Sequence, residues 1–121
     1  MKTGLSIAIV ATAAALAAAP ASACTRSGYR YGMDYASATS RWTVNRNKPC
    51  RGYLNVGNLY LVGLTFIEKP KHGIAGSASR YQYAYQPDKD YVGPDRFVMR
   101  IEFNLRGVNG HTDVTFNVNV R

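Results

Sequence analysis

The chain has 121 residues, with 15 Lys and Arg against 7 Asp and Glu, which gives a formal net charge of +8. Hydrophobic residues make up 46% and charged residues 18%, and this ordinary globular usage excludes a wholly disordered or collagen-like chain. The length allows one folded domain and not two.

Residues 1–23 have the features of a secretory signal peptide. Lys2 provides a positive start, residues 5–19 are mainly apolar, and Ala21 and Ala23 supply the small side chains of an A-x-A cleavage site. An apolar stretch of about 15 residues is shorter than the roughly 20 that a membrane-spanning helix needs. We therefore expect export to the periplasm or the extracellular space, with cleavage after Ala23 and no transmembrane segment in the mature form.

The mature domain, residues 24–121, holds two cysteines, Cys24 and Cys50, and loses only Lys2 from the charge count, so its net charge is +7. In an oxidising compartment an even pair of cysteines predicts a disulfide. Closing a loop of about 27 residues would stabilise the fold by roughly 3–4 kcal/mol. The alternative is a lipid anchor on Cys24, although lipoprotein signals prefer leucine where this chain has Ala21.

Alternating hydrophobicity, which is typical of β-strands, begins at residue 41. Residues 41–46 place Trp42 and Val44 on one face. Residues 51–56 form a second alternating segment, in which Tyr53 faces away from its neighbours.

The next segments are a long apolar run and a second alternating one. Residues 59–68 are almost continuously apolar, which predicts a central strand covered on both faces. Pro70 ends this strand because proline cannot donate to a sheet ladder. Gly73 and Gly76 predict the following turn, and residues 80–86 alternate again.

The clearest strands are residues 96–106 and 113–121, whose inward side chains are Phe97, Met99, Ile101, Phe103, Leu105, Val114, Phe116, Val118 and Val120. Between them, Asn109-Gly110 favours a two-residue hairpin turn because both residues tolerate positive φ. With the turn there, Leu105 faces Val114 and Arg106 faces Asp113. A slip of one residue would oppose every apolar side chain with a polar one.

Short strands with a turn signal every eight to twelve residues predict an all-β fold, a small β-sandwich or barrel. Three motifs then stand out: Lys69-Pro70-Lys71-His72-Gly73, Tyr83-Ala84-Tyr85-Gln86-Pro87 and Tyr91-Val92-Gly93-Pro94-Asp95-Arg96-Phe97. Together they resemble bacterial immunoglobulin-like (cadherin-like) domains of exported proteins over about residues 59–121. The resemblance implies a small immunoglobulin-like β-sandwich of antiparallel strands that serves as an adhesive, spacer or structural module.

Side chains suited to catalysis or metal binding are few. His72 and His111 could form a general acid–base pair in a small secreted basic hydrolase or nuclease, but each adjoins a glycine in a predicted turn, where we expect it to be solvated. Asp88, Asp90 and Asp95 do not fit the spacing of a calcium loop and are expected to cap turns. We therefore expect no catalytic residue, metal or cofactor.

Tyr81, Tyr83 and Tyr85 share one face of the 80–86 segment. They form either part of the core or an exposed strip for stacking on sugars or peptides. With Arg96 and Arg100 they make up the candidate binding surface.

The charge of +7 attracts polyanions. Export makes an anionic envelope polymer or glycan, or an acidic protein, a better match for this charge than nucleic acid. The sequence thus predicts an exported, non-catalytic interaction or structural module of the bacterial cell envelope that binds an anionic or protein partner. A secreted hydrolase, and an inhibitor or chaperone-like binder of one exported protein, are the alternatives.

Overall fold

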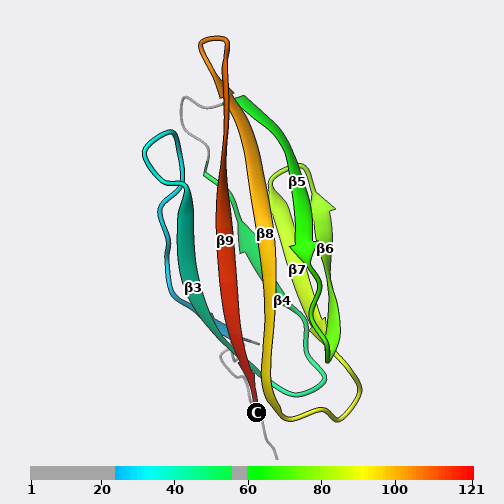
Figure 1. Cartoon of the computed structure of the whole chain (residues 1–121). Helices are drawn as coiled ribbons and strands as arrows, with labels where there is room; N and C mark the ends of the chain where they lie inside the picture. The colour runs from blue at the N-terminus through cyan, green and yellow to red at the C-terminus, as the bar shows by residue number, and fades with distance from the viewer. Residues whose placement is uncertain (1–23, 56–59) are drawn as a thin grey trace, which may run out of the picture.

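The computed structural model describes residues 24–55 and 60–121 (Figure 1). The segment predicted as a signal peptide, residues 1–23, lies outside the described residues. The described residues form eight strands: β2 (Cys24–Arg26), β3 (Ser37–Val44), β4 (Cys50–Tyr53), β5 (Tyr60–Glu68), β6 (Gly73–Ser79), β7 (Gln82–Pro87), β8 (Gly93–Leu105) and β9 (Val108–Val120). Among these residues there is no helix that is long and apolar enough to cross a membrane.

The strands make two sheets packed face to face, so the predicted all-β sandwich is confirmed (Figure 1). One sheet has five strands in the order β2-β3-β9-β8-β5, and the other has three in the order β4-β7-β6. Neighbouring strands are antiparallel with one exception, since β3 runs parallel to β9. The edge strands β2 and β4 are joined by the disulfide Cys24–Cys50, which links one sheet to the other.

Aromatic side chains fill the space between the sheets. Trp42 from β3 stacks on Tyr83 from β7 with ring centroids 5.8 Å apart, and Phe97 stacks on Phe116 at 4.6 Å. The inward positions predicted for β8 and β9 are buried from Phe97 to Phe103 and from Val114 to Val120. The alternation of the sequence therefore located the core correctly.

The β8–β9 hairpin turns at Arg106-Gly107, and the predicted turn at Asn109-Gly110 is wrong. Arg106 has φ 53° and Gly107 has φ 85°, so both residues of the turn lie in the left-handed region. Paired residue numbers sum to 213 (Phe103 faces Gly110) and not to 219. The two sums differ by an even number, so the same side chains still face the core, but each pairs with a different residue across the hairpin.

Gly73, Gly76 and Gly110 lie within strands and not in turns as predicted. Gly110 faces Phe103, and a Cβ added to it would lie 2.8 Å from the Phe103 ring. Gly73 belongs to β6, where an added Cβ would lie 2.6 Å from the carbonyl oxygen of Gln86. Gly73 and Gly110 thus allow close approach of the neighbouring strand, which a turn signal in the sequence does not reveal.

Strand β5 is an edge strand and is not central as predicted. Within the residues that the structure describes, it pairs with β8 alone. Val62 and Ile67 are accordingly exposed, by 56% and 46%. The apolar run reflects one buried face and one exposed apolar face, which the sequence pattern did not distinguish.

Candidate functional site

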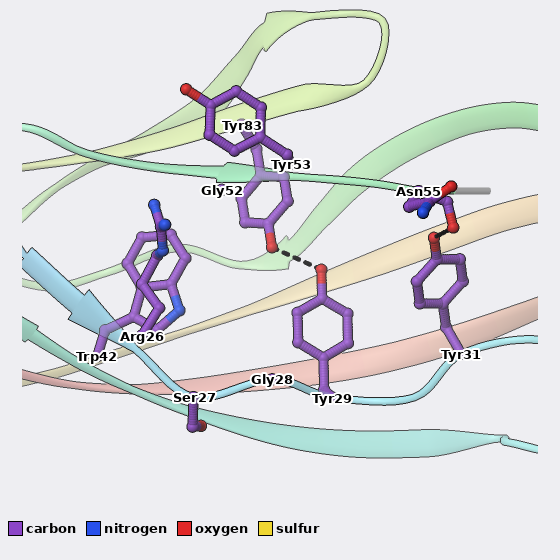
Figure 2. A pocket seen from close by; sticks show the side chains of 10 residues that line it. All are labelled: Arg26, Ser27, Gly28, Tyr29, Tyr31, Trp42, Gly52, Tyr53, Asn55 and Tyr83. Carbon is purple, nitrogen blue, oxygen red and sulfur yellow. Dashed lines mark hydrogen bonds between the residues drawn. The ribbon is translucent and has the colours of Figure 1, made fainter.

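A cleft of about 450 Å³ opens on the side of the sandwich where the edge strands β2 and β4 meet (Figure 2). One wall is residues 26–31, the end of β2 and the coil after it. The other wall is residues 52–55, the end of β4 and the coil that follows. Trp42 and Tyr83 line the cleft from the core, and each is only 2% exposed.

The disulfide holds the two walls together. Cys24 stands two residues before Arg26 in one wall, and Cys50 stands two residues before Gly52 in the other. The Arg26 guanidinium also donates a hydrogen bond across the gap to the carbonyl of Arg51. The short strand β2 is thus tied to β4 at the point where the cleft begins.

Further along, tyrosine hydroxyls join the first wall to Tyr83 in the core and to the second wall (Figure 2). The hydroxyl oxygens of Tyr29 and Tyr83 are 2.5 Å apart, and the Tyr31 hydroxyl donates to the carbonyl of Asn55. Burial raises the pKa of Tyr29 and of Tyr31, and it raises the pKa of Tyr83 to about 12. All three phenols are therefore protonated at neutral pH. In the Tyr29–Tyr83 pair, the accepting hydroxyl keeps a proton that it can donate to a ligand oxygen.

The missing side chain of Gly52 makes this arrangement possible. Gly52 pairs with Tyr83 across β4 and β7, and an added Cβ would lie 2.3 Å from Cζ of Tyr83. The Tyr83 ring can therefore pass over the β4 backbone to reach Tyr29. The next residue, Tyr53, points to the other side of β4 and is 60% exposed (Figure 2).

Positive charge is concentrated in the part of the chain that builds the cleft. Residues 24–55 contain one carboxylate, Asp34, and six cations: Arg26, Arg30, Arg41, Arg46, Lys48 and Arg51. This segment has a net charge of +5, whereas residues 60–121 have eight cations against six carboxylates and a net charge of +2. Within the described residues, all three ion pairs lie in the second segment, between residues 68 and 113. The cleft is thus built mainly from the more positive segment of the chain, and Arg26 is the one cation among its lining residues.

The predicted tyrosine strip is not exposed. Tyr83 and Tyr85 point into the core and are 2% and 0% exposed, so only Tyr81 lies at the surface, with 41% exposed. The Tyr85 hydroxyl donates to Asp95 at 2.7 Å, and burial raises the pKa of Tyr85. The interpretation of this face as core is therefore correct for Tyr83 and Tyr85, although the Tyr83 hydroxyl reaches the cleft.

Arg96 and Arg100 lie on the outer face of the five-stranded sheet, so the structure does not bring them together with the tyrosines. Arg96 Nε is 3.2 Å from Glu68, and Arg100 donates to Asp113 through Nε and Nη2, at 2.7 and 3.0 Å. The Arg100 guanidinium holds the pKa of Asp113 below its usual value. Both arginines are paired with carboxylates.

The two histidines lie at opposite ends of β8. The backbone amide of His72 donates to Asp95, and the His72 ring stacks on Tyr91 with centroids 4.2 Å apart. His111 lies in β9 opposite Glu102. Asp95 and Glu102 are seven residues apart on β8, or roughly 23 Å. The geometry does not assemble an acid–base pair from His72 and His111.

Of the aspartates near Gly93, Asp95 caps a turn, as predicted for it, whereas the Asp90 carboxylate accepts from the side chain of Asn47. Asp95 accepts backbone hydrogen bonds from Lys71 and His72 and so fixes the β5–β6 connection to β8. Asp90 and Asn47 exchange two hydrogen bonds, one from each residue. In the part of the chain that the structure describes, no group of three His, Cys, Asp or Glu side chains is placed to hold a metal ion.

Comparison with known proteins finds no matching family and no significant match among characterised proteins. Among solved structures, an endo-fucoidan hydrolase from glycoside hydrolase family 107 aligns with 96% of this chain and 16% of its own chain, at 9% sequence identity and a TM-score of 0.42. This chain thus spans about one sixth of that protein. A likeness of this degree assigns neither a family nor an activity.

Proposed function

We propose that this protein is an exported, non-catalytic binding module of the bacterial cell envelope, with an immunoglobulin-like sandwich, and that its cleft binds an anionic glycan. The observation that carries the proposal is the position of the aromatic cleft, which lies on the segment of net charge +5. Arg26 in the cleft wall provides the cation that would face a carboxylate, sulfate or phosphate group.

The size and chemistry of the cleft favour a glycan over a folded protein. Its volume of about 450 Å³ lies within the range of small-ligand sites, which combine aromatic walls with a few polar groups. A protein partner would need about 800 Å² of surface on each side. The exposed ring of Tyr53 offers an apolar face to a sugar ring, and the Tyr29–Tyr83 hydroxyls offer donors and acceptors to sugar hydroxyls.

Two further features support export and binding without catalysis. The disulfide Cys24–Cys50 is of a kind that persists in oxidising compartments. Every ionisable side chain that lines the cleft is an arginine or a tyrosine, so a ligand would meet charge, hydroxyl and ring contacts there.

Binding to immobilised polygalacturonate, with neutral dextran as the reference surface, tests the proposal. We expect binding to the anionic polymer alone, weakened by added salt because the contacts are partly exposed charge pairs. Arg26→Ala should weaken binding about tenfold or more, since a hydrogen bond to a charged group contributes roughly 1.5–3 kcal/mol. Arg106→Ala, the same change of charge at the remote β8–β9 turn, is the control.

Binding to the anionic polymer that does not change with ionic strength would overturn the proposal. An equal loss of affinity in Arg26→Ala and Arg106→Ala would also overturn it, because binding would then depend on the net charge of the protein and not on a cation in the cleft.

A further inference from the structure

The outer face of the three-stranded sheet lies beside the cleft, because β4 belongs to both. Side chains that point outward from β4 and β7 alternate with buried ones, whereas no residue of β6 is buried. The principal members of the face are Arg51, Tyr53, Ile74, Gln82, Ala84 and Gln86. Ile74 is 73% exposed and Tyr53 is 60% exposed. This face, the outer β4-β7-β6 face, is therefore open to solvent.

The register of the strands shows what a ligand would meet on this face. Tyr53 pairs with Gln82, and Ala84 pairs with Arg51 on one side and Gly76 on the other. Small side chains thus occupy the middle of the face and larger ones lie around them. Three strands at about 4.8 Å spacing span about 10 Å, which is room for about two sugar rings.

The charges of the two outer faces differ in a way that matters for a polyanion. Strands β4, β6 and β7 contain no Asp or Glu, and Arg51 lies on the strand next to the cleft. The outer face of the five-stranded sheet carries Glu68, Glu102 and Asp113, and its Arg96 and Arg100 are paired with Glu68 and Asp113. An anionic chain that leaves the cleft would therefore meet an unopposed cation, Arg51, and no carboxylate on the strands of the outer β4-β7-β6 face.

Tyr53 connects this face to the cleft. Tyr53 is among the residues that line the cleft, and its ring stands on the side of β4 opposite to Tyr83, whose hydroxyl points the other way to Tyr29 (Figure 2). A sugar ring stacked on Tyr53 would thus continue onto the row formed by Tyr53 and Gln82.

Resting on the proposed function, we infer that the binding site extends from the cleft over Tyr53 onto the outer β4-β7-β6 face, and that it takes several consecutive residues of a linear anionic polysaccharide. Gln82 and Gln86 carry amides that both donate to and accept from sugar hydroxyls. The small residues Ala84 and Gly76 let the chain approach the sheet closely. The cleft alone would hold a short fragment, and the face adds affinity for longer ones.

Calorimetric titration of the oxidised protein with galacturonate oligomers of two, four and six residues tests this inference. We expect affinity to rise about tenfold or more from the dimer to the hexamer. Ala84→Glu places a carboxylate in the middle of the face and should remove this gain while leaving dimer affinity unchanged. The matched control is Thr39→Glu, the same added charge on an exposed position of β3 in the other sheet.

A second variant guards against misfolding of Ala84→Glu. Gln82→Ala combined with Gln86→Ala adds no charge and should lower hexamer affinity severalfold with no change for the dimer. Thermal unfolding of each variant checks that the fold is intact.

Equal affinity for all three lengths would overturn the extended site, as would equal hexamer affinity of Ala84→Glu and Thr39→Glu. In both cases binding of the dimer that depends on Arg26 would leave the proposed function standing. Failure of the unmodified protein to bind any of the oligomers would instead overturn the glycan-binding cleft, and the extended site with it.

Discussion

One methyl group added at position 52 tests whether the cleft requires the Tyr83 ring to lie against the backbone of β4 at Gly52, from where its hydroxyl reaches Tyr29. In Gly52→Ala, the new Cβ would lie 2.3 Å from Cζ, 2.5 Å from Cε2 and 2.6 Å from the hydroxyl oxygen of Tyr83. Carbon atoms in favourable contact are about 3.5–4.0 Å apart, so the ring must move by more than about 1 Å. Trp42 and Phe116 pack against the ring at centroid distances of 5.8 and 5.4 Å and limit that movement.

The expected cost follows from these contacts. Overpacking a core costs about 1–3 kcal/mol, and the displaced hydroxyl loses its hydrogen bond to Tyr29, a net contribution of about 1 kcal/mol. The smaller conformational freedom of alanine in the unfolded chain returns about 0.4–1 kcal/mol. We therefore expect Gly52→Ala to lower the free energy of unfolding by roughly 1–3.6 kcal/mol. In a domain of this size each kcal/mol corresponds to about 4–8 °C in Tm.

Gly76→Ala is the matched control, because it lies in β6 of the same sheet and its added Cβ would meet nothing within 4 Å. This variant should be as stable as the parent or slightly more stable. Chemical denaturation gives the free energies, and titration with galacturonate dimer shows whether Gly52→Ala also loses cleft binding. Equal stability and equal binding of the two variants would refute the role assigned to Gly52.

Three other predictions concern stability. Replacing Cys24 and Cys50 by serine should lower the free energy of unfolding in urea by roughly 3–4 kcal/mol, because the disulfide closes a loop of about 27 residues; no loss would contradict this. Stability should fall between pH 10 and pH 12, since the folded state keeps the Tyr83 proton that the unfolded chain releases above the ordinary tyrosine pKa of 10.0. Tyr83→Phe should make that fall shallower in denaturation curves, and an unchanged slope would exclude this origin. Asp95→Asn should lower the free energy of unfolding, measured by chemical denaturation, by about 2 kcal/mol or more. The asparagine side chain has one accepting oxygen, whereas both oxygens of Asp95 accept hydrogen bonds from the backbone N–H groups of residues 71–72. Stability equal to that of the parent would contradict this prediction.

The burial pattern of β8 and β9 was predictable from the sequence, whereas their register was not. Alternation determines which face each side chain takes, and a shift by an even number preserves those faces. Asn109-Gly110 and Arg106-Gly107 both offer a glycine to a two-residue turn, and local preference favours the former. The packing of Gly110 against Phe103 and the hydrogen bond from the Gly107 amide to Asn104 belong to the folded hairpin, so the sequence pattern could not reveal them.

The position of β5 at the edge of its sheet could also not be predicted from the pattern of apolar residues. An apolar run predicts burial on both faces only if other elements are present to cover them. Here the sheet ends at β5, and Arg80 donates to the carbonyl of Leu61 in β5 while lying over the ring of Tyr60. That contact depends on the β6–β7 turn, which is distant from β5 in the sequence.

The cleft could not be predicted from local patterns because its walls come from separate parts of the chain. Residues 26–35 contain two arginines and three tyrosines, a density that could have marked them as a candidate site. The alternation of the 80–86 segment draws attention to that segment instead, although such alternation is typical of a core strand. Of its tyrosines, only Tyr83 contributes to the cleft, through its hydroxyl.

Departures from the strand pattern locate the cleft better than the pattern does. Gly52 occupies an inward position of β4 where a sandwich would ordinarily carry a large apolar side chain, and this loss of packing is offset by the Tyr83 ring that takes the space. The hydroxyl of Tyr29 forms a partly buried hydrogen bond with the hydroxyl of Tyr83, which a smaller residue at position 29 would not need. Natural chains break local rules mainly at functional sites. A glycine facing the core, a tyrosine pair and a disulfide all at one edge of the sandwich are therefore the departures from the strand pattern on which the proposed ligand site rests.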